Sequence, residues 1–136
     1  MDLQESKVQN RYLNYLNKKE HFDVKGTTQR LTTYISGLAP AQREKILSLL
    51  KQVQHIQNSN SDVYTKSGQI KNILWTAQSL RSKLITGKIS AIIASNLTFG
   101  TGRIEDMGLG SAYDVWGCLA DKFGAQIIAG TIRNFE

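Results

Sequence analysis

The sequence predicts a mainly α or α+β protein, with about four amphipathic helices followed by a C-terminal helix that one or two short strands flank. Apolar residues recur with the 3.6-residue period of a helix through residues 1–87. The last third instead holds isoleucine-rich runs and glycines, which favour strands and turns. The chain has 136 residues, 40% of them hydrophobic, enough for one core. We therefore expect a single domain over 1–136, with a basic helical part, 1–87, before an apolar, glycine-containing part, 88–136.

Two helices are predicted before the only proline of the chain. The first spans about residues 4–19, and Gly26 is expected to break the chain after it. The second begins at Thr27 or Thr28, because a threonine side chain can cap the first backbone N–H groups of a helix. Gly37 is a natural residue for its C-terminal end. The apolar positions of the two helices are Val8, Tyr12, Tyr15 and Leu16, and then Leu31, Tyr34, Ile35 and Leu38.

The third helix begins at Pro40, since proline suits the first turn of a helix. It carries its apolar residues on one side and polar residues, Lys45 and Lys51 among them, on the other. Residues 58–61 form a polar break. A long fourth helix then runs from about Asp62 or Ser67 to Ile85, and Gly87 is expected to stop it. The apolar stripes are Ile46, Leu49, Leu50, Val53 and Ile56, and then Ile70, Ile73, Leu74, Ala77, Leu80 and Leu84.

The elements of the last third are less uniform. Residues 88–99 are rich in isoleucine and have no charge after Lys88, which fits a buried strand or a buried helix equally. Ser111 with Asp114 three residues later resembles a capping box, so a broadly apolar helix is expected to begin there and to end at Gly124. Residues 125–135 are predicted to form a terminal strand. Unpaired strands would be adhesive edges, so we expect this third to self-associate.

The positive charge is concentrated in the first two thirds of the chain. The formal net charge is +6. Residues 1–58 hold nine Lys/Arg against five Asp/Glu, residues 59–88 five against one, and residues 89–136 three against five. This asymmetry predicts a polyanionic partner such as nucleic acid, or else a solvated basic surface. The candidate partner surface consists of Lys7, Arg11, Lys18, Lys19, Lys25, Arg30, Lys71, Arg81, Lys83 and Lys88.

A glycine-rich stretch over residues 97–117 is a second candidate site. Backbone N–H groups at a helix N-terminus bind anions, and Gly108, Gly110 and Ser111 precede the predicted helix. Arg103 could add a bidentate phosphate contact. Two adjacent acidic residues, 105 and 106, would repel a phosphate, so the same stretch also fits a conformationally mobile loop. The sequence therefore predicts either an anion or nucleotide site there or a hinge.

Catalytic and metal-binding patterns are absent from the sequence. His21 and His55 are 34 residues apart and have no neighbouring ligand, so we expect no metal and no cofactor. Cys118 lies in the apolar helix predicted from Ser111, where a buried small hydrophobe is expected rather than a nucleophile. No apolar run is long enough for a membrane span, and no secretory leader is evident, so an intracellular, non-enzymatic protein is expected.

One segment resembles a known family. Residues 80–99, LRSKLITGKISAIIASNLTF, are similar to the strand of helicase-loader AAA+ ATPases that ends in Ser/Thr-Asn. The resemblance implies a strand, with Asn96 as a nucleotide sensor. The chain departs from that family because it has no phosphate-binding glycine–lysine loop and no paired acids after an earlier apolar strand. We therefore expect a binding protein, with nucleic acid or another protein as its partner, or else a homo-oligomeric module.

Overall fold

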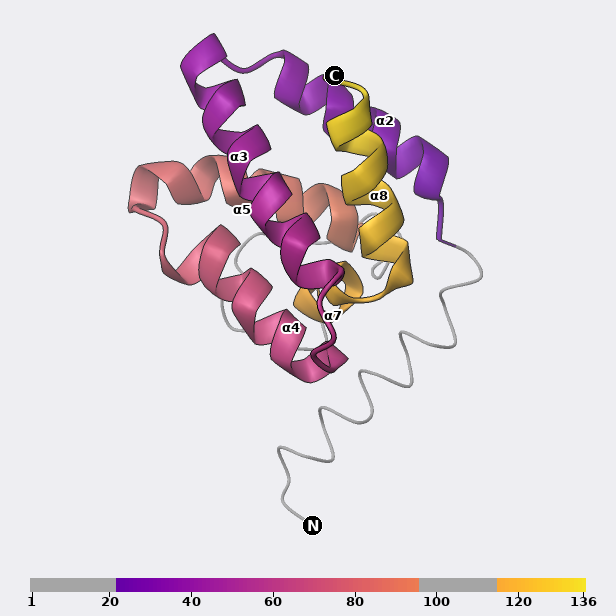
Figure 1. The fold of residues 1–136 in the computed structure, drawn as a ribbon. Coiled ribbons are helices and arrows are strands. Elements are labelled where there is room, and N and C mark those ends of the chain that lie inside the picture. The colour runs from indigo at the N-terminus through magenta and orange to yellow at the C-terminus, as the bar shows by residue number, and fades with distance from the viewer. Residues whose placement is uncertain (1–21, 96–114) are drawn as a thin grey trace.

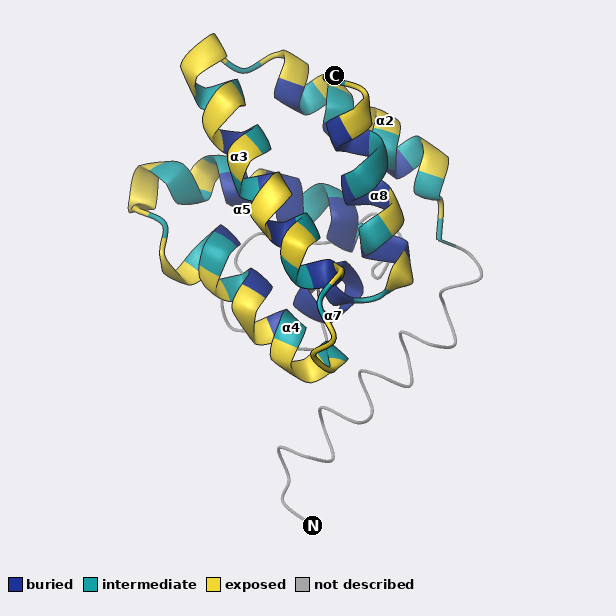
Figure 2. Ribbon diagram, in the orientation of Figure 1, coloured by how far each residue is buried: buried dark blue, intermediate teal, exposed yellow. Residues whose placement is uncertain are grey.

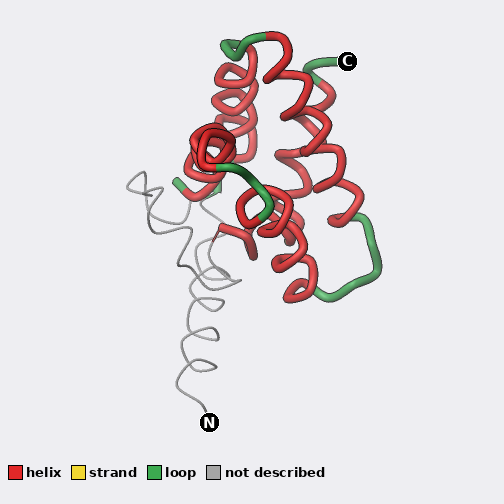
Figure 3. Tube along the Cα trace, turned by 90° about the vertical axis from the view of Figure 1, so that its left-hand side faces the viewer, coloured by secondary structure: helices red, strands yellow, loops and turns green. Residues whose placement is uncertain are grey.

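The computed structural model describes residues 22–95 and 115–136, and these form a helical protein (Figure 1). Figure 3 shows helices and loops but no strand in these two segments. The mainly α prediction is therefore confirmed for the described residues. Two predictions lie outside the described residues: the helix over 4–19 and the start of a helix near Ser111. The elements are α2 (Val24–Ser36), α3 (Pro40–Gln57), α4 (Val63–Lys71), the π-helical turn η2 (Asn72–Thr76), α5 (Leu80–Ala94), α7 (Val115–Ala120) and α8 (Lys122–Arg133).

The first two described helices begin differently, α2 with a capping side chain and α3 with a proline in its first turn. The N-cap of α2 is Asp23, whose carboxylate accepts the backbone N–H of Gly26 at 2.8 Å. The helix therefore starts before Thr27, and Gly26 lies in its first turn instead of breaking the chain. Gly37 is the C-cap of α2, as expected, and Pro40 opens α3. The predicted boundaries of the third helix are confirmed.

The long helix predicted from Asp62 to Ile85 is interrupted. Asp62 caps α4, and the helix then passes into the π-helical turn η2. After a short break, Ser79 caps α5 through a hydrogen bond from the Ser82 backbone N–H, 3.2 Å long. A capping serine can therefore start a new helix within a segment whose apolar residues follow one continuous helical period. Gly87 is a buried residue inside α5, and its lack of a side chain does not stop a helix that tertiary packing holds.

The isoleucine-rich segments are helices and not strands. Residues 88–94 belong to α5, so the strand implied by the AAA+ resemblance is not present, and Asn96 lies outside the described residues. The predicted strand over 125–135 is helix α8 as far as Arg133. In a strand, Ile127 and Ile128 would face opposite sides, whereas both are fully buried in α8. The buried positions of α8 are Phe123, Gly124, Ile127, Ile128, Thr131 and Ile132, which repeat at helical spacing.

The junction between α7 and α8 is tight. The helices are separated by Asp121, which caps α8, so the predicted helix ends before Gly124 rather than at it. Gly124 lies in the first turn of α8, and a Cβ added there would be 2.5 Å from the Cys118 carbonyl oxygen and 2.7 Å from that of Leu119. Only a residue without a side chain allows the two backbones to approach this closely.

The core lies where α8 and α7 pack against the earlier helices. α8 lies between α2 and α3 in Figure 1, and α7 packs mainly against α4. Figure 2 shows the buried residues on the inward sides of these helices. Gln57 at the end of α3 is buried, and its Nε2 donates to the Leu119 carbonyl of α7 at 2.6 Å, although 62 residues separate them. This packing leaves the other side of α3 exposed to solvent.

Candidate functional site

Three hollows lie along α3, and together we call them the α3 groove. The largest, about 860 Å³, lies between the end of α3 and α4 with η2. A second, about 480 Å³, shares His55, Ile56 and Ile73 with the first. The third, about 130 Å³, lies between the first half of α3 and the start of α5. The first two hollows are joined through the residues they share, and the third lies further along α3 with lining residues of its own.

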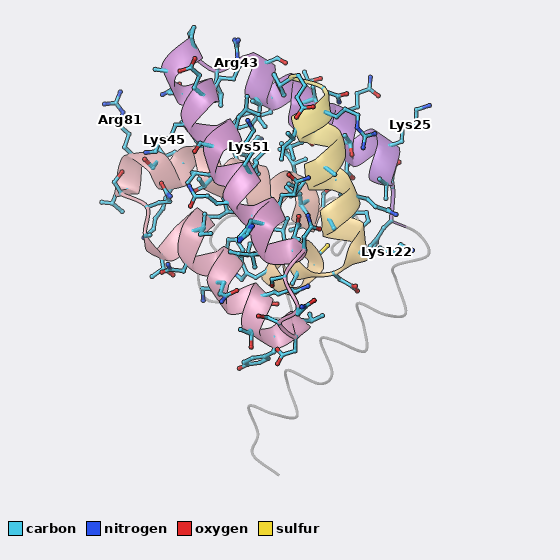
Figure 4. The ribbon with its side chains drawn as sticks, in the orientation of Figure 1. Lys25, Arg43, Lys45, Lys51, Arg81 and Lys122 are labelled. Carbon is cyan, nitrogen blue, oxygen red and sulfur yellow. The ribbon has the colours of Figure 1, made fainter. Side chains whose placement is uncertain are left out.

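The residues lining the α3 groove are basic or neutral. Lys45 and Arg81 line the third hollow, and Lys51 and His55 line the second. Among the described residues, no aspartate or glutamate lines any of the three. The Lys45 ammonium also donates to the Ser82 hydroxyl at 3.0 Å, which links α3 to α5. Figure 4 shows Lys45 and Arg81 close to one end of this face, with Lys51 further along α3.

Two acidic residues lie near the groove without lining it. Glu44 is exposed on α3 and is seven residues, about two helical turns, before Lys51. Asp62 caps α4, because its carboxylate accepts a hydrogen bond from the Thr65 backbone N–H at 2.7 Å. This hydrogen bond holds the pKa of Asp62 below its ordinary value. Glu44 is therefore the acidic side chain best placed to lower the positive potential of this face.

Other basic side chains have structural roles. Arg43 donates to the carbonyl oxygens of Ser36 and Leu38, at 3.1 and 3.3 Å, where α2 ends. Lys66 donates to the carbonyl oxygen of Gln57, at 2.8 Å, where α3 ends. Cations at these positions satisfy the carbonyls and the negative end of the helix dipole. Both side chains therefore satisfy helix ends within the protein.

The candidate partner surface predicted from sequence does not form one patch in the described residues. Lys25 and Arg30 belong to α2, and Lys25 lies at the opposite edge of Figure 4 from Arg81. Arg81 and Lys88 are exposed on α5, and Lys71 is half-buried at the end of α4. Lys83 lies over the Trp75 ring, 5.2 Å from its centroid. The remaining candidates are outside the described residues: Lys7, Arg11, Lys18, Lys19, and the anion-site residues Arg103, Gly108, Gly110 and Ser111.

Sequence reasoning missed the residues that line the groove apart from Arg81. Lys45 and Lys51 were placed on the polar side of the third helix but not in the partner surface. A usable signal was present, because Lys45 and Gln52 are seven residues apart and so lie on one side of the helix, beside the apolar stripe. Tyr64 gave no such signal. Tyr64 lines the groove only because α4 lies beside α3 in the fold.

A separate apolar feature lies on α5. Leu80 and Leu84 are 85% and 71% exposed, although both were predicted to belong to an apolar stripe. They are four residues apart and so lie one above the other on the same helix face. The serine cap and the break before α5 turn this face outward, while Ile89 and Ile93 of the same helix are buried. Exposed leucines next to one another are candidates for a contact with another molecule.

The described residues offer few groups for catalysis. Cys118 is fully buried, as predicted, and burial together with the nearby Asp121 carboxylate raises the pKa of its thiol. A thiol in this state is a poor nucleophile. Within residues 22–95 and 115–136, no three His, Cys, Asp or Glu side chains gather at a distance suited to a metal ion. None of the helices in these segments is both long and apolar enough to cross a bilayer.

Comparison of the chain with protein-family models, with curated proteins and with solved structures finds no match.

Proposed function

We propose that the protein binds nucleic acid through the α3 groove and acts as a non-catalytic binding protein. The observation that carries the proposal is the lining of the groove, in which Lys45, Lys51 and Arg81 lie among neutral polar residues and isoleucines, with no carboxylate from the described part of the chain. Lysine and arginine supply affinity for phosphates by releasing the counterions of the nucleic acid. Serine, glutamine and asparagine side chains in the same lining can bond to sugars and base edges.

The charge arrangement distinguishes this face from a generally basic surface. Arg43 and Lys66 neutralise helix ends and so do not contribute an outward-facing cation. The groove cations instead come from two helices, α3 and α5, that the fold brings together, as the hydrogen bond between Lys45 and Ser82 shows. Cations aligned along a hollow concentrate positive potential where a polyanion would lie.

Binding of a fluorescent oligonucleotide, measured by anisotropy over a salt series, tests this function. Affinity should fall as salt rises, with a slope of log K against log salt that grows by about 0.7 to 0.9 for each phosphate contact. The double substitution Lys45→Gln/Lys51→Gln should weaken binding and flatten the slope by about 1.4 to 1.8. Lys25→Gln/Lys122→Gln is the matched control, because it removes the same charge at the opposite edge of the molecule (Figure 4).

Glu44 provides a test with the opposite sign. Glu44→Gln removes a negative charge beside the groove and should tighten binding at low salt, with a smaller gain at high salt. Equal loss of affinity in both double variants would show that only the net charge matters, and the groove would then have no special role. Absence of any salt-dependent binding by the unaltered protein would reject the nucleic-acid function itself.

A second candidate function is self-association through Leu80 and Leu84, whose exposure is the specific observation that favours it. The basic residues Arg81 and Lys88 lie on the same exposed face, so two copies would repel each other at low salt. Self-association should therefore strengthen as salt rises, whereas nucleic-acid binding weakens. Light-scattering mass across a salt series separates the two, and Leu80→Ser/Leu84→Ser should abolish any multimer. A mass that stays monomeric at all salt concentrations would reject this candidate.

The earlier reason to expect self-association, namely unpaired strands in the last third, does not apply to the described residues. Residues 88–94 and 125–133 are helical, and their isoleucines are largely buried. Any self-association of the described part is thus better assigned to α5 than to the C-terminal third. The anion site proposed around Gly108 and Ser111 lies outside the described residues and stays a prediction.

A further inference from the structure

Tyr64 is an exposed aromatic residue at the end of the α3 groove furthest from Lys45 and Arg81. It is the second residue of α4 and is 57% exposed. Among the large hydrophobic side chains of the described residues, it and the two α5 leucines are the exposed ones. It lines the largest hollow together with His55 of α3 and Asn72 of η2. An aromatic ring in this position offers a face to whatever enters the hollow.

The hollow beside Tyr64 is open and is lined by polar side chains together with Ile56 and Ile73. Gly68 follows Tyr64 by four residues and so lies one turn further along the same side of α4. A Cβ added at Gly68 would meet no atom within 4 Å, so this turn leaves space next to the ring. Thr65, Gln69 and Asn72 supply hydrogen-bonding groups to the same hollow. A flat polar heterocycle stacked on the ring would thus find both space and hydrogen-bonding partners.

The cations lie at a distance that suits a short strand. Lys45 and Ile56, at the two ends of the groove on α3, are separated by eleven residues, which corresponds to about 16 Å of helix. Stacked nucleotides of one strand rise about 3.4 Å each, so this length accommodates about five nucleotides. Phosphates would follow Arg81, Lys45 and Lys51, and a base at the far end would reach Tyr64.

We propose that the α3 groove takes single-stranded nucleic acid, with one base stacked on the ring of Tyr64. This inference rests on the proposed nucleic-acid function and adds the class of strand and the residue that selects it. In a duplex, both faces of each base are covered by its neighbours, so Tyr64 has nothing to stack on. In a single strand, every base can turn a face to an aromatic ring, whatever its identity. The groove therefore selects for strandedness and not for sequence.

The test compares Tyr64→Leu and Tyr64→Phe on a short single strand and on a duplex of the same length. An oligothymidine of about twelve nucleotides is long enough to fill the groove. Tyr64→Phe keeps the ring and should retain binding within about twofold. Tyr64→Leu removes the stacking face and should weaken single-strand binding by about fivefold or more, with no change in duplex binding. Because no charge is altered, the slope of affinity against salt should stay the same in both variants.

The results would distinguish a failure of base stacking on Tyr64 from a failure of nucleic-acid binding as such. Unchanged single-strand binding by Tyr64→Leu, together with the loss expected for Lys45→Gln/Lys51→Gln, would overturn the stacking role and leave the nucleic-acid function standing. Tighter binding of the duplex than of the single strand by the unaltered protein would do the same. Failure of the unaltered protein to bind either probe would reject both. Circular dichroism of each variant verifies that the helices are retained.

Discussion

Gly124→Ala should destabilise the protein, even though alanine is the better helix former. Gly124 lies inside α8, where replacing glycine by alanine ordinarily gains about 1 kcal/mol of helix stability. Here the new Cβ would lie 2.5 Å from the Cys118 carbonyl oxygen and would also meet the Leu119 Cα. Carbon and carbonyl oxygen approach no closer than about 3.3 Å, so the backbones of α7 and α8 would have to separate by about 0.8 Å.

The magnitude follows from what would have to move. The atoms that the Cβ meets belong to the backbone of α7, which cannot rotate away as a side chain would. Overpacking of this kind costs about 1 to 3 kcal/mol, and it would also disturb the buried Trp116, Leu119 and Phe123 around the junction. We expect a net loss of about 1 kcal/mol, and at most about 2 kcal/mol, after the gain in helix propensity is included.

Urea unfolding followed by circular dichroism measures this change. The matched control is Gly68→Ala, since Gly68 is exposed within α4 and a Cβ there meets no atom within 4 Å. That variant should be more stable than the unaltered protein by about 0.5 to 1 kcal/mol. The two alanine substitutions should therefore shift the midpoint in opposite directions. A stabilising effect of Gly124→Ala, equal to that of the control, would refute the tight α7–α8 junction.

Three further predictions concern stability and reactivity. Arg43→Ala should lower the free energy of unfolding by about 1 to 2 kcal/mol, because two carbonyls at the end of α2 lose their donor; the same urea titration measures it, and Arg43→Lys should recover part of the loss. Cys118 should not react with a thiol reagent in the native protein and should react on unfolding, since burial raises the pKa of its thiol; rapid native labelling would contradict this. Asp62→Asn should reduce the loss of stability in acid. The hydrogen bond from the Thr65 backbone N–H lowers the pKa of Asp62, so its stabilising contribution is present above the unfolded-state pKa and is lost as pH falls through the folded-state pKa; an unchanged acid midpoint would contradict this.

Local signals in the sequence predicted some elements well. α3 begins at Pro40 and buries Ile46, Leu50 and Val53, which is the stripe that its spacing indicates. Both signals lie within the helix itself, so no knowledge of the remaining chain is needed. The burial of Cys118 was predicted in the same way, from its place in an apolar segment.

The errors came from composition and from competition between elements. The last helix was mistaken for a strand because β-branched residues favour strands, whereas the spacing of Phe123, Ile127 and Thr131 is that of a helix. The predicted fourth helix was too long because the Ser79 cap starts a new helix in the middle of a continuous apolar pattern. In both cases, the way a segment packs in the fold decided between two local possibilities.

The α3 groove could not be found from sequence alone. The hydrogen bond between Lys45 and Ser82 joins residues 37 positions apart, and Tyr64 becomes part of the site only because α4 lies beside α3. Charge asymmetry predicts a polyanionic partner, which stays a prediction, and it does not indicate that the candidate cations lie apart in the fold. A count of cations along the sequence does not show where they lie in the fold. The cations of α2 and α5 lie at opposite edges of the molecule (Figure 4).

The position of α8 between α2 and α3 has a consequence for synthesis. Asn134 at the end of α8 donates to the Thr32 hydroxyl of α2 across 102 residues at 3.0 Å, and the apolar side of α2 contacts α8 along its length. A ribosome adds about 5 to 20 residues per second, so α2 leaves it about 5 to 20 seconds before α8 is made. During that interval Leu31 and Ile35 have no α8 to cover them. A nascent chain halted before Lys122 would thus present an apolar helix face to the chaperones that survey new proteins.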